Sequence, residues 1–217
     1  MKDKILKTAK DEFFKHGIQN IAIKNLIEPL GISTKTVYKY FKNKEMLLEQ
    51  VLKLHYSEQI QLLESQSDEQ PVIPFFVRIW KNGFEREKGV NSKFFHDLHK
   101  YYPELEKKVE RQIGKKIWIH FQRIVDKGIQ QGAFLKDTLP EVLMESISVL
   151  YIASVRTDQF NKFGTTPFQI LQNTVFIFIR GFCTLKGIQE LDQHLQELDD
   201  FENKSSLKGD SIKAINN

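Results

Sequence analysis

Apolar residues recur at intervals of three and four along most of this chain, and this period constrains the fold more than any other feature of the sequence. The longest example, 105–128, keeps one face apolar for about six turns. The six prolines fall mainly where helices should begin or end, and no stretch alternates apolar and polar residues between hairpin turns. The sequence therefore predicts an all-α protein with about nine helices in total.

Capping signals predict several helix boundaries. Thr138 and Thr166 each stand three residues before a Glu or Gln, with a proline between them, which is the spacing of a capping box. We expect one helix to start at each threonine, and the second of these helices to end near Gly187. The polar segment 65–74 predicts a loop, and the residues beyond Asp200 predict a flexible tail.

The composition narrows the class of protein. The single cysteine, Cys183, excludes an intramolecular disulfide framework, and the chain starts with an amphipathic segment rather than an apolar signal sequence. The longest purely apolar run, 175–179, is far shorter than the roughly 18 to 20 residues that cross a bilayer. We therefore expect a cytoplasmic protein with no membrane partner.

Positive charge is concentrated at the front of the chain. Residues 1–45 hold ten lysines against five acidic side chains, which gives this segment a net charge of +5. Because the net charge of the whole chain is +4, the rest of the chain carries −1. A basic module on a nearly neutral body favours binding to a phosphate backbone through counterion release. A solvated, lysine-rich surface explains the charge alone equally well.

Two short apolar stripes flank a glycine turn within this basic segment. Residues 23–30 and 33–41 predict two helices, and Gly31-Ile32-Ser33 predicts the turn between them. This is the pattern of a helix-turn-helix unit, whose second helix presents polar side chains to DNA. The side chains that we expect to face outward from that helix are Thr34, Lys35, Thr36, Tyr38 and Lys39. Their hydroxyl and ammonium groups suit phosphate oxygens and base edges.

The run 31–47, GISTKTVYKYFKNKEML, resembles the DNA-binding signature of the tetracycline-repressor (TetR) family. The shared features are the glycine turn, the serine at the helix entry, the Tyr-x-Tyr-Phe run and a Lys-Glu pair that opens the next helix. The resemblance implies a second helix in or beside the major groove and a phosphate contact from Lys44. The residues predicted to bind double-stranded DNA are Ser33, Thr34, Lys35, Thr36, Tyr38, Lys39, Tyr40 and Lys44.

Two positions depart from the family pattern. The family usually has Ser or Thr at the start of the first of these two helices, whereas this chain has Ala22, which lacks a hydroxyl to cap the helix or to touch a phosphate. Pro29 falls late in the same helix and disfavours helical geometry at Glu28, so we expect a bend or an early end there.

The resemblance also implies a domain organisation and a function. Residues 1–46 would form the three-helix DNA-binding domain, 47–200 a larger helical ligand-binding and dimerisation domain, and 201–217 a flexible tail. The implied function is a homodimeric repressor that binds a palindromic operator and is released by a small molecule, although an activator would share every feature. The alternative is an all-helical small-molecule-binding or enzymatic bundle with no role on DNA.

Aromatic residues are frequent after residue 74, and the resemblance implies an effector pocket between the helix that starts at Lys44 and the helix after residue 139. Such a pocket would suit an apolar or aromatic effector, although helical stripes bury aromatic residues whether or not a cavity exists. The candidate pocket residues are Trp80, Phe84, Phe94, Trp118, Phe121, Tyr151 and Phe178.

In the family, the last two long helices pair with those of a second copy in a four-helix bundle. Small residues on these helices would allow close approach, but packing inside one chain explains most of the same residues. The candidate dimer-interface residues are Ser146, Ile147, Leu150, Ala153, Ser154, Val175, Phe178, Gly181 and Phe182.

Neither catalysis nor a cofactor is expected. The chain has no glycine-rich phosphate loop, nucleophile elbow or paired metal-binding motif. His96 and His99 could approach one metal ion together with Asp97 or His120, but histidines on an exposed helix surface are the commoner explanation. No metal site is therefore predicted.

Overall fold

The computed structural model describes residues 1–65, 70–156 and 159–199. Within these ranges the regular elements are helices, and the only β-type contact recorded is one isolated antiparallel bridge between Phe134 and Cys183. The all-α prediction is confirmed. The helices are α1 (Lys2–His16), α2 (Ile23–Leu26), the 3₁₀-helix η1 (Glu28–Leu30), α3 (Thr34–Tyr38), α4 (Lys44–Glu64), α5 (Val72–Lys88), α6 (Ser92–Tyr101), α7 (Pro103–Gln130), α8 (Pro140–Val155), the 3₁₀-helix η2 (Asn161–Phe163), α9 (Pro167–Asn173), α10 (Val175–Arg180) and a last helix over 185–199.

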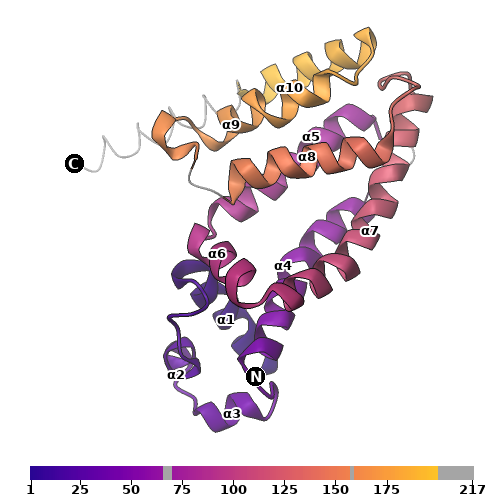
Figure 1. Ribbon diagram of the computed structural model, residues 1–217. Helices are drawn as coiled ribbons and strands as arrows, with labels where there is room; N and C mark the ends of the chain where they lie inside the picture. The colour runs from indigo at the N-terminus through magenta and orange to yellow at the C-terminus, as the bar shows by residue number, and fades with distance from the viewer. Residues whose placement is uncertain (66–69, 157–158, 200–217) are drawn as a thin grey trace, which may run out of the picture.

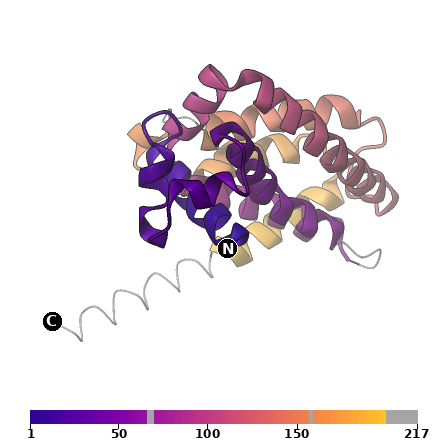
Figure 2. The same ribbon diagram turned by 90° about the horizontal axis from the view of Figure 1, so that it is seen from below.

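The molecule is elongated, with the short N-terminal helices at one end. Figure 1 shows α1, α2 and α3 at the bottom, α4 and α7 side by side along the length of the molecule, and α8, α9 and α10 across the top. Seen from below in Figure 2, the short N-terminal helices lie in front of the rest. The basic segment of the sequence is therefore presented at one tip.

Two separate apolar cores hold these helices together. The N-terminal core combines the buried side chains of α1 to α4 with six residues from 90–109. These six residues are Val90, Phe94, Phe95, Leu98, Leu105 and Val109. The C-terminal core runs from Leu63 to Leu191 and is built from α5, α8, α9, α10 and the second half of α7. The helix α6 and the start of α7 thus pack with the N-terminal helices, which the predicted boundary at residue 46 does not anticipate.

The predicted disturbance at Pro29 is confirmed. The helix α2 ends at Leu26, and the chain continues as the 3₁₀-helix η1, with Pro29 in its first turn. The N-cap of α2 is Ala22, which makes no side-chain capping bond, as expected from its missing hydroxyl.

The two predicted capping boxes have different outcomes. Thr166 caps α9 and receives a hydrogen bond from Gln169 N–H at 3.2 Å, while the Gln169 side chain accepts from Thr166 N–H at 2.8 Å. The prediction at Thr138 is wrong, because α8 starts one residue later, with Leu139 at the N-cap and no side-chain cap. The buried Thr138 hydroxyl has no hydrogen-bond partner.

The helix that begins at Pro167 does not continue to Gly187. It is interrupted at Thr174 and ends at Arg180, because the following residues pair with the loop between α7 and α8. In that pairing Leu135 N–H donates to Phe182 C=O, and Thr184 N–H donates to Ala133 C=O, both at 2.9 Å. The last helix then starts at residue 185.

Two other predicted segments have different outcomes. The predicted loop over 65–74 is shorter than expected, since α5 already begins at Val72. The predicted tail beyond Asp200 lies outside the described residues. None of the described helices is both long and apolar enough to span a membrane.

Candidate nucleic-acid interface

A left-handed glycine turns the chain between η1 and α3. Gly31 has φ 60° and ψ 25°, a conformation that residues with a Cβ rarely adopt, and its N–H donates to Glu28 C=O. Ser33 then caps α3: its hydroxyl accepts from Thr36 N–H at 3.2 Å and lies 3.1 Å from the Thr36 hydroxyl. The turn and the cap together set the direction in which α3 leaves the body of the protein.

Apolar side chains fix the inner face of this unit. Leu26, Val37 and Phe41 are at most 1% exposed and belong to the N-terminal core, while Leu30 and Ile32 pack against its edge. Because the burial leaves α3 little freedom to rotate, the residues between these positions are held outward.

The outer face of α3 and of the residues after it is basic and aromatic. Tyr38 and Tyr40 expose 51% and 43% of their surface, and Lys35 and Lys39 are exposed as well. Thr34 and Thr36 are half-buried, and Thr36 is engaged with the Ser33 cap. Exposed lysine and tyrosine side chains along a short helix and just after it are suited to contacts with phosphates and with base edges.

Lys44 is the first residue of α4 and makes intramolecular hydrogen bonds. Its ammonium donates hydrogen bonds to Ile18 C=O at 2.5 Å and to Ile21 C=O at 2.7 Å, so it faces the loop between α1 and α2. Burial lowers the pKa of Lys44, and the nearby carboxylate of Asp97 opposes this shift. In this structure the Lys44 ammonium is engaged with backbone carbonyls, and its phosphate contact stays a prediction.

The same loop is held from the other side by α6. The Asp97 carboxylate is 3% exposed and accepts hydrogen bonds from Ile18 N–H and Gln19 N–H, both at 2.8 Å. Gly17, with φ 81°, passes close to this carboxylate, since a Cβ there would lie 2.9 Å from Asp97 Oδ2. A buried charge with two donors is a strong attachment, and it joins the N-terminal helices directly to α6.

A second attachment lies at the end of α1. Asn91, the N-cap of α6, donates from its backbone N–H to Phe14 C=O at 2.8 Å and from its side-chain amide to Lys15 C=O at 3.3 Å. These bonds satisfy carbonyls that the last turn of a helix otherwise leaves unpaired. Sequence reasoning missed the structural roles of Asn91 and Asp97, because their partners are more than seventy residues away along the chain.

Polar side chains also connect the two cores. Arg156, at the end of α8, donates to both oxygens of Glu87 on α5 at 3.1 and 3.4 Å, and to the hydroxyl of Tyr56 on α4 at 2.9 Å. Its guanidinium lies 4.6 Å from the ring centre of Phe95 on α6. His55 stands 3.8 Å from Glu87 and packs edge-on against Phe14 of α1. This cluster therefore links five helices.

Three of the predicted pocket residues line one small pocket between α4, α5, α7 and α8. Trp80, Phe121 and Tyr151 form part of its wall, together with Glu87 and Arg156. Its volume is about 140 Å³.

The other predicted pocket residues lie elsewhere. Phe84 is packed within the C-terminal core and Phe94 within the N-terminal core, where both are at most 3% exposed. Trp118 stacks on Phe121 with ring centres 6.4 Å apart. Phe178 is 37% exposed on α10. Core packing rather than cavity formation explains Phe84 and Phe94.

The predicted dimer-interface residues divide into two groups. One group is buried inside this chain, because α8 packs against α10 here: Ile147, Ser154, Val175 and Phe182. The other group is exposed or half-buried: Ser146, Leu150, Ala153, Phe178 and Gly181. The exposed apolar side chains around these helices that the sequence did not single out include Val142, Val149 and Ile177, each 59% exposed.

The histidines of α6 do not gather with other metal ligands. The His99 ring nitrogen lies 3.1 Å from a carboxylate oxygen of Glu106, and His96 is exposed. In the part of the chain that the structure describes, no three His, Cys, Asp or Glu side chains come together as a metal site would require.

Comparison with known proteins agrees with this geometry. Residues 5–51 match the family model of bacterial regulatory proteins of the tetR family. This range covers most of α1, all of α2 and α3 and the first turns of α4, and it includes the glycine turn and the exposed lysines and tyrosines. No curated protein matches the chain.

The whole fold is shared with solved structures of low sequence identity. A TetR-family transcriptional regulator from Marinobacter aquaeolei VT8 is similar, with a TM-score of 0.69, 17% identity and coverage of 91% of this chain and 98% of that one. The regulatory protein TetR from Rhodobacter sphaeroides has a TM-score of 0.68 at 10% identity, covering 83% and 97%. The fatty acid degradation regulator FadR from Bacillus halodurans has a TM-score of 0.64 at 17% identity, covering 79% and 94%. The chain thus carries the N-terminal domain that the model of bacterial regulatory proteins of the tetR family describes, within an all-helical fold that it shares with these solved structures.

Proposed function

We propose that this protein is a homodimeric repressor that binds a near-palindromic operator and is released from it by a small molecule. The reader is formed by residues 1–46, and the remaining helices to residue 200 form the sensor and the dimer interface. The observation that carries the proposal is the exposed surface formed by Lys35, Tyr38, Lys39 and Tyr40 at one tip of the molecule. The helix α3, which presents this surface, is capped by Ser33 and packs its inner face into the N-terminal core.

A second copy would place a second reader on the DNA. Val142 and Val149 on α8 and Ile177 on α10 are exposed apolar side chains on neighbouring helices, and covering them with the same helices of a second copy would remove apolar surface from water. Two readers related by a twofold axis would reach half-sites about one helical turn apart, roughly 34 to 36 Å. The operator is therefore expected to be an inverted repeat.

The contacts of α6 support a route by which a ligand acts on DNA binding. The helix α6 is attached to the reader through Asp97 and Asn91, and it meets Arg156 through Phe95. A molecule that separates α5 from α8 near Arg156 would disturb α6, and through it the loop between α1 and α2. Its effect on DNA affinity cannot exceed the difference between its affinities for the two arrangements.

Selection of genomic DNA fragments by the purified full chain tests this function. We expect one inverted repeat to be enriched, and its affinity to fall steeply with salt concentration. The double variant Lys35→Ala, Tyr38→Ala should weaken operator binding by about 10- to 100-fold, since it removes two contacts from each reader.

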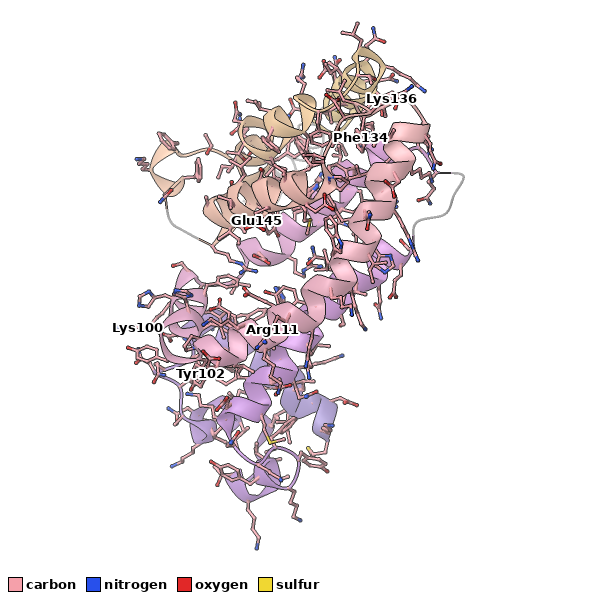
Figure 3. All side chains as sticks on the ribbon, turned by 45° about the vertical axis from the view of Figure 1, so that its right-hand side comes forward. Lys100, Tyr102, Arg111, Phe134, Lys136 and Glu145 are labelled. Carbon is pink, nitrogen blue, oxygen red and sulfur yellow. The ribbon has the colours of Figure 1, made fainter. Side chains whose placement is uncertain are left out.

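A matched control removes the same side-chain types from another exposed surface. Lys100 and Tyr101 lie on α6 (Lys100 is labelled in Figure 3), with the Lys100 ammonium 5.3 Å from the Tyr101 ring centre. The variant Lys100→Ala, Tyr101→Ala should bind the operator like the unchanged protein. Weak binding without sequence preference by the unchanged protein, or equal losses in both double variants, would contradict the proposal.

A further inference from the structure

The pocket between α4, α5, α7 and α8 is small and has apolar walls. Its walls include Phe76, Ile79 and Trp80 from α5, Ile117 and Phe121 from α7, and Met144 from α8. Its volume is about 140 Å³, close to the roughly 150 Å³ of an apolar cavity that accommodates benzene. As it stands, the pocket matches a molecule of about one ring.

The charges in its wall are already neutralised. Glu87 and Arg156 both line the pocket, and they are joined by two hydrogen bonds. The Arg156 charge holds the pKa of Glu87 at about 2 despite its burial, so the carboxylate is ionised at neutral pH. His55, behind Glu87, has a pKa lowered by burial and is uncharged at neutral pH. A ligand with a net charge would therefore add an unpaired charge to a desolvated site, which is costly.

Two hydrogen-bond donors in the wall have no partner. Trp80 and Tyr151 are 7% and 8% exposed, and neither Trp80 Nε1 nor the Tyr151 hydroxyl makes a hydrogen bond. Buried polar groups are almost always paired, since leaving one unpaired destabilises the fold. Two such groups in one pocket wall require an explanation.

The two side chains that carry these donors are neighbours. The rings of Trp80 and Tyr151 have centres 5.5 Å apart. The Tyr151 hydroxyl lies against Gly83, one turn after Trp80 on α5, where a Cβ would come within 3.0 Å of it. Trp80 of α5 and Tyr151 of α8 thus form adjacent parts of the pocket wall.

We propose that this pocket binds a small, uncharged, single-ring molecule with one hydrogen-bond acceptor, and that Trp80 and Tyr151 donate to that acceptor. The proposal rests on the proposed function, since it names the class of effector that the sensor recognises. Entry takes place beside Ile152 and Arg156, which line both this pocket and a larger groove of about 850 Å³ along α6 and α7.

Four probes of similar size separate charge from hydrogen bonding. Acetophenone is neutral with an acceptor, ethylbenzene is neutral without one, and benzoate and benzylammonium carry opposite charges. Calorimetric titration of the full chain should show acetophenone binding at least tenfold more tightly than either ion. Tighter binding of benzoate or benzylammonium, or no binding of acetophenone up to its solubility, would overturn the proposal.

Variants that delete one donor at a time test the role of the two side chains. Tyr151→Phe and Trp80→Phe should each weaken acetophenone binding about fivefold and leave ethylbenzene binding nearly unchanged. Tyr102→Phe is the matched control, because Tyr102 lies at the corner between α6 and α7, outside the pocket (Figure 3). Equal losses for acetophenone and ethylbenzene would show that the side chains act only through their shape, and the assignment of the donors would fail.

Two further measurements keep the tests independent. Without any ligand, Tyr151→Phe should raise the melting temperature, because it removes an unpaired buried hydroxyl; a lower melting temperature would mean that the hydroxyl has a partner in the protein. Operator binding is measured separately on the same preparations. Operator binding without probe binding overturns only the ligand class, whereas probe binding without any selected DNA overturns only the repressor function.

Discussion

Asp97 connects the reader to the rest of the molecule through two backbone N–H groups of the loop between α1 and α2. Asp97→Ala leaves both N–H groups without their hydrogen-bond acceptor and with little access to water. We expect it to lower the free energy of unfolding by about 2 to 3 kcal/mol. Asp97→Asn keeps one acceptor oxygen and should cost less. Urea denaturation of the three proteins measures this order, and operator affinity should decline in the same order. Equal stability of all three would show that the loop needs no anchor.

The ion pair of Glu87 and Arg156 predicts how stability depends on pH. The pKa of Glu87 is about 2 in the folded protein against an ordinary value of 4.5, so its contribution is present above pH 4.5 and is lost as the pH falls toward 2. Glu87→Gln should be less stable than the unchanged protein at neutral pH, and this difference should shrink by about 3 kcal/mol in strong acid. Unfolding free energies across this range test the prediction, which a constant difference would contradict.

His55 adds a second decrease of the unfolding free energy, at a higher pH than the decrease due to Glu87. Burial lowers its pKa below the ordinary 6.5. Just below pH 6.5, His55 is therefore protonated in the unfolded chain but still neutral in the folded protein. Stability should therefore begin to fall as the pH drops below about 6.5. His55→Gln should remove this first decline while the later one from Glu87 remains. A profile that is unchanged by His55→Gln would assign the first decline to another group.

Cys183 is expected to be chemically inert in the folded protein. It is 5% exposed, and burial raises the pKa of its thiol to about 12, so almost no thiolate forms at neutral pH. Iodoacetamide should label it slowly in buffer and at the rate of an ordinary thiol in urea. Labelling at the same rate in both conditions would show that the thiol is accessible.

At the scale of elements, alanine substitutions at two glycines of α7 should have opposite effects on stability. A Cβ at Gly128 would lie 2.1 Å from the Phe134 ring, which Figure 3 labels near the end of α7, whereas a Cβ at Gly114 meets nothing within 4 Å. Gly128→Ala should therefore destabilise the protein by about 1 to 3 kcal/mol through overpacking. Gly114→Ala should stabilise it by about 0.5 to 1 kcal/mol, since alanine favours a helix. Melting temperatures of the two variants must move in opposite directions.

Local signals in the sequence predict the elements of the reader well. The Gly31 turn, the Ser33 cap and the disturbance at Pro29 depend only on residues a few positions away in the chain. Each of them can therefore be predicted from the local sequence. The capping box at Thr138 fails because spacing alone does not tell which of two adjacent residues becomes the cap. The role of Asp97 could not be predicted, since its partner Ile18 is 79 residues away and only the tertiary fold brings them together.

The residues that line the pocket are harder to predict than those of the reader, because they too depend on the tertiary fold. Helical periodicity identifies which face of a helix is buried, but it does not say whether that face meets a cavity or another side chain. Phe94 and Trp80 have the same pattern in the sequence, yet Phe94 packs in the N-terminal core and Trp80 lines the pocket. Which aromatic residues line a cavity depends on the packing of four helices.

At the scale of the whole molecule, the proposed dimer predicts a dissociation phenotype. Val149→Asp together with Ile177→Asp places two charges on the exposed apolar surface of α8 and α10, and should convert the protein to a monomer in sedimentation velocity. The monomer should lose affinity for an inverted repeat while its melting stays cooperative. Ile119→Asp, at a 43% exposed position on α7, is the control and should remain dimeric. A dimer that survives both substitutions must use another surface.

The composition of the N-terminal core limits how such a protein can be recombined. Phe94, Phe95 and Leu98 of α6 complete the apolar packing around α1 and α4, and the Asp97 bonds close the loop beside it. A chimera joined at residue 46 would set the reader of one protein on the α6 of another and mismatch both. A chimera that exchanges 1–52 together with 90–109 keeps the buried residues of this core together. We therefore expect new DNA specificity to be transferred without loss of stability only when both chain segments come from the same protein.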